Sequence, residues 1–314
     1  MDLDKDLSLK LLEKMLLTRK FEEKVYDLAK KGVVHGSVHL CIGEEATAAG
    51  TVLALDKSDY IMPTHRGHGQ ALAKGADPKK FLAEIIAKET GLCKGRVGSM
   101  HTYDRENNNL GAQGILGAQF PISIGVGLSI KLKKLDSVVM CSFGDGTSNQ
   151  GTFFEGLNFA DIWDLPIVFV CVNNLYGMGT HYSDTCNISI NQKAKIFNII
   201  TETADGNDVE EVYLKTKKLV SKVKKEKRPA LIECYTYRWL GHSAFDNRPY
   251  RPKEEVKKWK KLDPIKRYID KLKKNNIEDS KIKSVKEKVD KIIAEAEKFA
   301  LASDYPTFDD SMEQ

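Results

Sequence analysis

The chain has few cysteines, and their spacing matches no metal or disulfide motif. The six are scattered with no CxxC pair, so neither a disulfide framework nor a zinc site is indicated. Cys141 and Cys171 lie inside apolar runs, where cysteine usually behaves as a small hydrophobic residue. Long apolar runs are also missing, since none approaches the roughly 18–20 residues that span a bilayer. We therefore expect no association with a membrane.

Charge of one sign is not concentrated either. The net charge is +5, but lysines alternate with glutamates in 209–227 and 283–298. Such mixing is typical of a solvated helix face rather than a phosphate-binding stripe, so we expect no nucleic-acid partner. The first 32 residues mix acids and lysines at helical spacing, unlike a signal or transit peptide. This pattern predicts a cytoplasmic protein that begins with a folded helix.

The 314 residues suffice for one large α/β domain, and their periodicity divides the chain into three parts. The first part predicts helices at 8–31, 43–55 and 77–91, followed by a polar stretch without regular structure at 92–114. The middle part predicts alternating elements: helices at 120–134, 152–163, 191–199 and 208–226, with strands at 137–143, 165–172, 198–206 and 229–239. The third part, after about residue 252, is predicted to be lysine-rich helix.

This alternation predicts a mainly parallel sheet that is covered by helices on both faces. We expect a single domain over 1–314, with a helical N-terminal extension at 1–58 and a helical C-terminal extension at 252–314.

Two of the predicted strands end on oxygen-bearing side chains. The first ends at Gly-Asp-Gly, with Asp145 between the glycines, and the second ends at Asn173-Asn174. In open parallel sheets, ligands bind beyond the carboxyl ends of the strands. A helix beginning near Ser148 would offer free backbone N–H groups to a phosphate, whereas Asp145 would repel one. Magnesium between the carboxylate and the phosphate removes this conflict, and Asn174 can supply an amide oxygen.

A simpler interpretation is a glycine turn followed by a helix cap. The two motifs, each at the end of an apolar strand and 29 positions apart (174 − 145), favour a cation and phosphate site.

The wider pattern resembles a known family. GDGTSNQG…VNNLYGMGT is similar to the thiamine diphosphate motif, which begins with GDG and ends with NN. HGSVHLCIGEEATAAG, THRGHGQALAKGAD, GLCKGRVGSMH, GAQGILGAQFPISIGVGL, YRWLGHS and RPYRPKEEVKKWKKLDPI match in the family's order. Together they resemble the alpha subunit of the thiamine-dependent first component of 2-oxo acid dehydrogenase complexes. This resemblance implies a thiamine diphosphate-binding fold with thiamine diphosphate and Mg²⁺ as cofactors.

The resemblance also implies roles for individual residues. Metal ligands would be the side chains of Asp145 and Asn174 and the carbonyl of Tyr176. The remaining cofactor-binding positions are Gly146 and Thr147, with His65, Arg66 and Arg238, at the diphosphate, Gly114 and Leu116 at the aminopyrimidine, and His242. Many relatives have tyrosine where this chain has His65. His39 and His242 would be catalytic, since imidazole exchanges protons near pH 7. Ser243, beside His242, is interpreted as an ordinary loop residue.

The resemblance implies partners as well. The glutamate that activates the aminopyrimidine comes from a separate beta subunit in this family, which predicts a heterotetramer of two alpha and two beta chains. The expected reaction is oxidative decarboxylation of pyruvate, with the acetyl group passing to the lipoyl group of an acyltransferase component. Acetoin cleavage is the alternative, and branched-chain 2-oxo acids are a weaker one.

Two other classes of protein would show different features in the sequence. A nicotinamide dehydrogenase would need GxGxxG directly after its first strand, whereas GVGLS follows a helix-like run. A scaffold subunit that has lost its site would show erosion at Asp145, Asn174, Arg66 or His242, and all four are intact.

Overall fold

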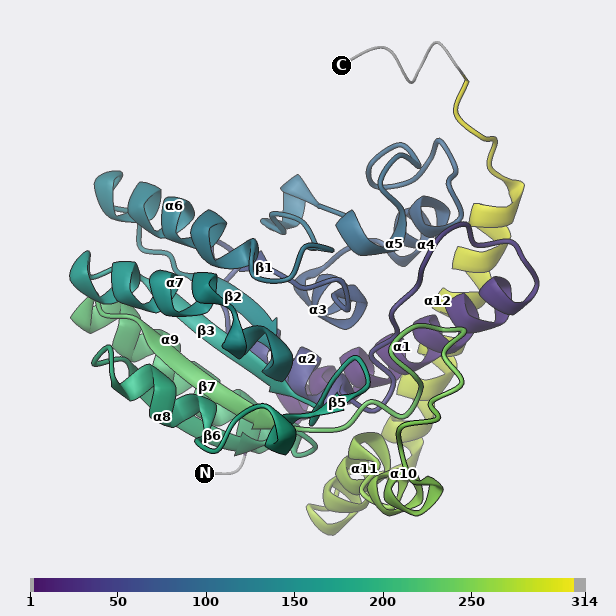
Figure 1. Cartoon of the computed structure of the whole chain (residues 1–314). Helices are drawn as coiled ribbons and strands as arrows, with labels where there is room; N and C mark the ends of the chain where they lie inside the picture. The colour runs from purple at the N-terminus through teal and green to yellow at the C-terminus, as the bar shows by residue number, and fades with distance from the viewer. Residues whose placement is uncertain (1–2, 308–314) are drawn as a thin grey trace.

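A five-stranded, wholly parallel β-sheet organises the chain (Figure 1). The computed structural model describes residues 3–307, and its strands lie in the order β1–β2–β3–β7–β6. Their bounds are Tyr60–Met62 (β1), Val139–Gly144 (β2), Ile167–Asn173 (β3), Ile200–Asp205 (β6) and Ala230–Tyr235 (β7). The predicted α/β class is confirmed. The edge strand β1 was not predicted, because three residues are too short to show a period.

Alternate residues of each strand face two different cores. On β2, Cys141 and Phe143 pack in a core with α6, α7 and α8, whereas Met140 packs in a core with α2, α3 and α9. The helices span Gln119–Leu132 (α6), Gly151–Ile162 (α7), Ile190–Lys195 (α8), Glu45–Leu53 (α2), His68–Lys74 (α3) and Val209–Glu226 (α9). Burial on both faces explains why the inner strands β2, β3 and β7 are nearly continuous apolar runs.

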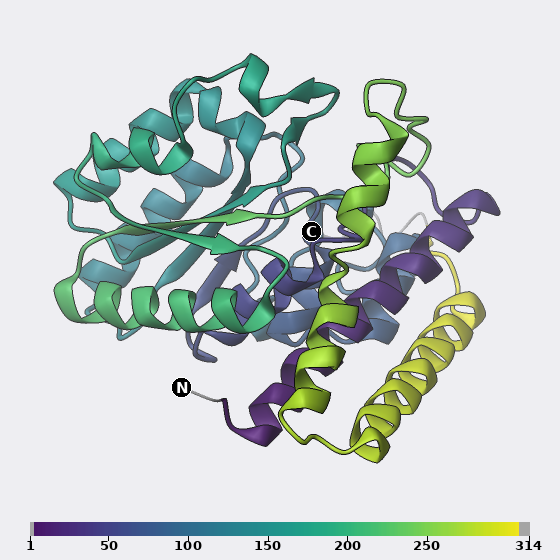
Figure 2. The same ribbon diagram turned by 90° about the horizontal axis from the view of Figure 1, so that it is seen from below.

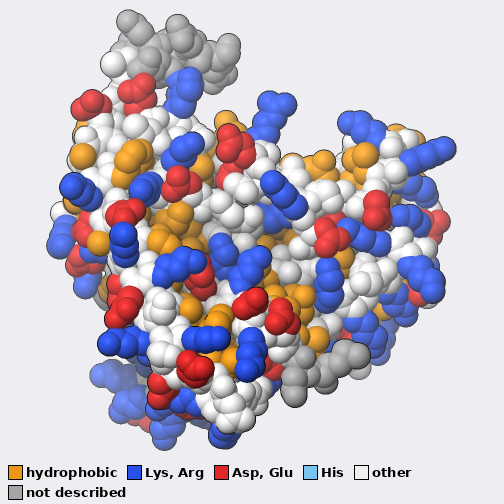
Figure 3. All heavy atoms as spheres, turned by 180° about the vertical axis from the view of Figure 1, so that it is seen from behind, with side chains coloured by type: hydrophobic (Ala, Val, Ile, Leu, Met, Phe, Trp, Pro, Cys, Tyr) orange, Lys and Arg blue, Asp and Glu red, His pale blue; other side chains and the backbone are white. Residues whose placement is uncertain are grey.

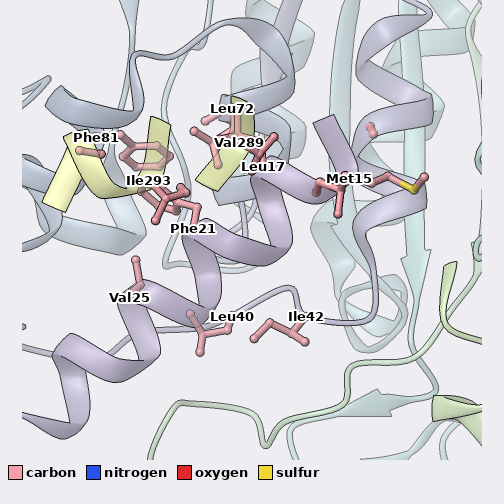
Figure 4. Close-up of a cluster of buried hydrophobic side chains, with 14 of the residues drawn as sticks. Met15, Leu17, Phe21, Val25, Leu40, Ile42, Leu72, Phe81, Val289 and Ile293 are labelled. Atoms are coloured by element: carbon pink, nitrogen blue, oxygen red, sulfur yellow. The ribbon is translucent and has the colours of Figure 1, made fainter. Parts of the chain in front are cut away.

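A third core joins the two ends of the chain. It is formed mainly by α1 (Lys5–Lys30), α4 (Pro78–Ile85), α11 (Pro264–Lys274) and α12 (Asp279–Ala302). Figure 2 shows α12 beside α1, and Figure 4 shows Phe21 and Phe81 among the side chains of this core. The two rings stack with their centroids 5.2 Å apart. The C-terminal helices are therefore packed parts of the fold; a further short helix, α10 (Lys253–Lys260), precedes them.

Several predicted boundaries were wrong. Helix α4 ends at Ile85 rather than near residue 91, because Ala87 adopts a left-handed conformation (φ 59°). The polar stretch at 92–114 contains a short helix, α5 (Gly98–His101), and a 3₁₀ turn at Arg105–Asn107. The helix expected to begin near Ser148 begins at Gly151, after a 3₁₀ turn at Asp145–Asn149. Helix α8 ends at Lys195 rather than 199, and strand β7 ends at Tyr235 rather than 239.

The surface agrees with the predicted charge mixing. On the face in Figure 3, lysine and arginine side chains are interspersed with aspartate and glutamate. Among residues 3–307, no helix is both long and apolar enough to cross a membrane.

Candidate active site

The carboxyl ends of four strands meet at one edge of the sheet. Asp145 follows β2 directly and Asn174 follows β3, and these strands pair in register up to Gly144 and Val172. His65 and Arg66 follow β1, and Arg238 follows β7. Because parallel strands share their direction, residues far apart in sequence converge here. The structure thus brings Asp145 and Asn174 side by side, as their spacing predicts.

A cavity of about 330 Å³ opens at this edge. Its polar lining includes Arg66, Asp145, Thr147, Asn174 and Arg238. Within the described part of the chain, Asp145 Oδ2 and Thr147 Oγ1 are buried and have no hydrogen-bond partner. Buried polar groups nearly always have partners, so these atoms indicate a ligand that the protein chain does not supply.

The oxygen atoms at the cavity suit a hard cation. Asp145 is only 2% exposed, and burial raises the pKa of its carboxyl to about 6, although Arg238 opposes this shift. Asn174 and Tyr176 line the same cavity, so an amide oxygen and a backbone oxygen are available near it. A carboxylate, an amide oxygen and a backbone oxygen form a donor set that Mg²⁺ accepts.

A two-stranded hairpin lies over the Gly-Asp-Gly turn. Its strands are β4 (Tyr176–Gly177) and β5 (Thr180–His181), which pair antiparallel. A Cβ atom on Gly146 would lie 3.1 Å from the Cα of Gly177, so both positions favour glycine for close approach. Arg238 Nη1 donates to the carbonyl oxygen of Tyr176 at 2.7 Å. Arg238, which follows β7, therefore holds the hairpin at the cavity.

Three histidines form a cluster at the cavity. The ring centroid of His39 lies 4.5 Å from that of His65 and 4.8 Å from that of His242. Burial, followed by the positive charge of Arg66, lowers the pKa of His39 to about 3, of His65 to about 2 and of His242 to about 4. These imidazoles are therefore neutral at pH 7, and each has a buried ring nitrogen without a partner in the described chain.

The histidine cluster and the oxygen site suit different ligands. One nitrogen from each imidazole can be grouped within 4.8 Å, a set that favours softer ions such as zinc or copper. Since Mg²⁺ favours oxygen, the donors around Asp145 suit it better than the cluster does. Unpartnered imidazole nitrogens can also exchange protons with a bound substrate.

The segment that carries His242 is fixed by hydrogen bonds. The backbone N–H of His242 donates to Asp246 Oδ2 at 2.7 Å, and the hydroxyl of Tyr250 donates to the same oxygen at 2.5 Å. Arg66 Nη2 donates to the carbonyl oxygen of His242 at 3.0 Å. Asp246 therefore holds the loop and Arg66 links it to β1, which explains how the imidazole comes to face the cavity.

The site and the sheet can be compared with known proteins. Residues 13–309 match the family described as "Dehydrogenase E1 component". This chain belongs to that family. Membership implies thiamine diphosphate as the cofactor, and E1 alpha subunits generally pair with a beta subunit.

Individual relatives cover nearly all of this E1 chain. The alpha subunit of acetoin:2,6-dichlorophenolindophenol oxidoreductase from Bacillus subtilis is 41% identical, over 98% of this chain and 92% of its own. The pyruvate dehydrogenase E1 alpha subunit of Rickettsia prowazekii is 36% identical, over 98% and 94%. A chloroplastic counterpart from Arabidopsis thaliana is 36% identical, over 96% and 72%. The chain is thus an alpha subunit of the E1 type.

Most positions that the E1 resemblance implied line the cavity. They are His65, Arg66, Leu116, Asp145, Gly146, Thr147, Asn174, Tyr176, Arg238 and His242. His39 is not part of the lining, but its ring contacts those of His65 and His242, which are. Gly114 is also outside the lining: a Cβ atom there would lie 2.7 Å from the ring of His101. The roles of all these residues remain predictions.

Sequence reasoning missed two acidic residues of this E1 site. Glu44 lines the cavity, and Asp246 fixes the His242 loop. Glu44 looks like an ordinary acid at a helix start, where acids favour the helix dipole. Its one signal is that glutamate is not a preferred N-cap residue. Asp246 has no signal in sequence, because its hydrogen bonds depend on how the loop folds.

Proposed function

We propose that this chain binds thiamine diphosphate and Mg²⁺ at the sheet edge and, with a beta subunit, cleaves a small carbonyl substrate. The observation that carries the proposal is the unpartnered, buried Asp145 Oδ2 beside Asn174, in a cavity that also contains two arginines. When bound, the cofactor supplies the nucleophile and the electron sink.

The cation and diphosphate would be held by groups of both signs. Asp145, Asn174 and the Tyr176 carbonyl would hold Mg²⁺. Arg66 and Arg238 would face the diphosphate oxygens, with Gly146 and Thr147 close to them through the backbone. Without the divalent cation, Asp145 would repel the diphosphate, so we expect binding to require Mg²⁺.

The histidine cluster would handle protons. In the chain alone, burial and Arg66 hold the pKa of His242 near 4, which is too low for efficient exchange at pH 7. A diphosphate beside Arg66 would offset that positive charge and raise the imidazole pKa toward neutrality. We propose that His242 and His39 then exchange protons with the substrate oxygen, whereas His65 lines the diphosphate end.

The site would be completed by other chains. We propose a heterotetramer of two alpha and two beta chains in which the beta subunit contributes the activating glutamate. A lipoyl group of an acyltransferase component would accept the two-carbon fragment.

For the substrate, we put acetoin first, because the Bacillus subtilis acetoin enzyme's alpha subunit is 41% identical to this chain. Pyruvate, the preference from sequence, is the second candidate, supported by 36% identity to pyruvate dehydrogenase alpha subunits over almost the same length.

The test uses the chain co-expressed with its beta partner. Thiamine diphosphate is titrated by calorimetry with and without Mg²⁺, for the wild type and for Asp145→Asn, which keeps the shape and removes the charge. Binding that needs Mg²⁺ and is lost in the variant supports the site. Absence of binding by the assembled wild type would refute the proposal.

The substrate is then tested by assaying acetoin, pyruvate and branched 2-oxo acids with an artificial electron acceptor. The ratio of their kcat/KM values assigns the substrate. Preference for a branched acid would contradict both candidates.

A further inference from the structure

Glu44 does not act as its position at the start of a helix suggests. It is the N-cap of α2, yet its side chain makes no capping hydrogen bond. Instead the side chain is buried (3% exposed) and lines the cavity. Burying a carboxyl is unfavourable unless it has partners, so its contacts indicate its role.

The partner of Glu44 is the amide of Asn174. Asn174 Nδ2 donates to Glu44 Oε1 at 2.7 Å. The other end of the amide, Oδ1, accepts from the backbone N–H of Tyr176 at 3.3 Å and from Arg238 Nη1 at 3.4 Å. Both of these contacts are long for hydrogen bonds, so the bond to Glu44 is the strongest of the three.

The three contacts together fix which end of the amide accepts hydrogen bonds, and the bond from Nδ2 to Glu44 is the shortest of them. The amide has one donor end and one acceptor end, and only the oxygen can bind a cation. A 180° flip would place two oxygen atoms, Asn174 Oδ1 and Glu44 Oε1, against each other. Glu44 therefore favours the orientation in which Oδ1 is available to a metal ion.

We propose that Glu44 is a positioning residue for the cation site, which acts by accepting a hydrogen bond from Asn174 and so keeps the amide oxygen directed at Mg²⁺. The inference rests on the proposed function, because it assumes that Asn174 is a metal ligand. Outer-shell partners of metal ligands typically contribute about 10–100-fold to metal affinity. Glu44 contributes through an intervening residue, so it is distinct from the proposed ligands.

The experiment measures metal affinity rather than turnover. The alpha–beta complex is loaded with a fixed concentration of thiamine diphosphate, and Mg²⁺ is titrated by calorimetry. Mn²⁺, followed by electron paramagnetic resonance, serves as a second probe. Glu44→Ala removes the acceptor, and Glu44→Gln keeps an oxygen that can accept. Glu255→Gln is the matched control, because Glu255 contacts the phenol of Tyr176 at 2.9 Å and not its carbonyl.

We expect Glu44→Ala to weaken Mg²⁺ and Mn²⁺ binding by at least about tenfold. The Glu44→Gln variant should retain most of the wild-type affinity for both ions, and Glu255→Gln should bind both ions like the wild type. Circular dichroism and the alpha–beta stoichiometry check that each variant is folded and assembled. If Glu44→Ala does not assemble, Glu44→Gln decides alone: affinity within about threefold of wild type supports an acceptor role, and a larger loss refutes it.

The outcomes separate this inference from the proposed function. If the wild type binds Mg²⁺ and Asp145→Asn does not, but Glu44→Ala binds like the wild type, the positioning role is wrong and the cation site stands. If Glu44→Gln binds as weakly as Glu44→Ala, Glu44 acts through its charge and the inference is refuted. If the wild type binds no Mg²⁺ with the cofactor, both proposals fail.

Discussion

Replacing Glu84 by glutamine should destabilise the alpha subunit severely, although the two side chains have the same shape. Glu84 is fully buried at the end of α4, and its carboxylate accepts four backbone N–H groups. Oε2 accepts from Cys93 and Gly95, each at 2.8 Å, and Oε1 accepts from Val97 at 2.9 Å and Gly98 at 3.1 Å. Segment 91–98 is thus wrapped around one carboxylate.

The loss in the free energy of unfolding depends on how many of these hydrogen bonds glutamine cannot make. Its oxygen can accept two of the four N–H groups, and its NH₂ would face the other two as donor against donor. Hydrogen bonds to a charged group contribute about 1.5–3 kcal/mol each, so losing two costs about 3–6 kcal/mol. Whole proteins are stable by only about 5–15 kcal/mol. The change therefore removes a large part of the net stability.

Loss of these hydrogen bonds should also disturb the residues beside the cavity. His101, three residues beyond the segment, lies against Gly114, and Leu116, two residues after Gly114, lines the cavity. We expect a melting temperature of the alpha–beta complex lower by about 6–24 °C, at roughly 2–4 °C per kcal/mol. Hydrogen exchange should also accelerate at residues 91–101.

Glu89→Gln is the control, because Glu89 is exposed one turn later and should change stability by less than about 0.5 kcal/mol. If Glu84→Gln melts within a degree of this control, with unchanged exchange, the reasoning is refuted.

Three further predictions concern the core, the cluster and the turn. Phe21→Ala should lower the free energy of unfolding by about 3–5 kcal/mol, measured by denaturant titration; a loss under 1 kcal/mol would contradict the packing in the third core. The unfolded chain protonates histidine near pH 6.5, whereas folded His65 does so near 2, so the unfolded state holds more protons in between and stability falls as pH falls. At pH 5 this amounts to about 2 kcal/mol for His65, and His65→Asn should flatten the profile. Gly146→Ala should weaken cofactor binding, measured by calorimetry, because its methyl group would press on Gly177; Gly125→Ala, whose Cβ meets no atom within 4 Å, is the control and should bind normally.

The sequence alone determined the class of fold and the centre of the site. Apolar runs alternating with helical periods require a parallel sheet buried on both faces, and β2, β3 and β7 were each predicted for that reason. Asp145 and Asn174 could be found because each directly follows a predicted strand, and the order of residues along the chain shows which end of a strand is its carboxyl end. Once two parallel strands are neighbours, their carboxyl ends must share an edge.

The tertiary structure decided what depends on contacts between distant segments. Helix α3 was missed because a run with glycines and histidines shows little helical period, whereas packing against α1 and α2 supports it. Glu44 and Asn174 are 130 residues apart, and nothing in the spacing of either indicates that they share a hydrogen bond. The three histidines likewise come from three separate connections. The periodicity of apolar residues in the sequence predicts which face of a helix or strand is buried. A hydrogen bond between two loops, by contrast, forms only after the sheet has brought those loops together.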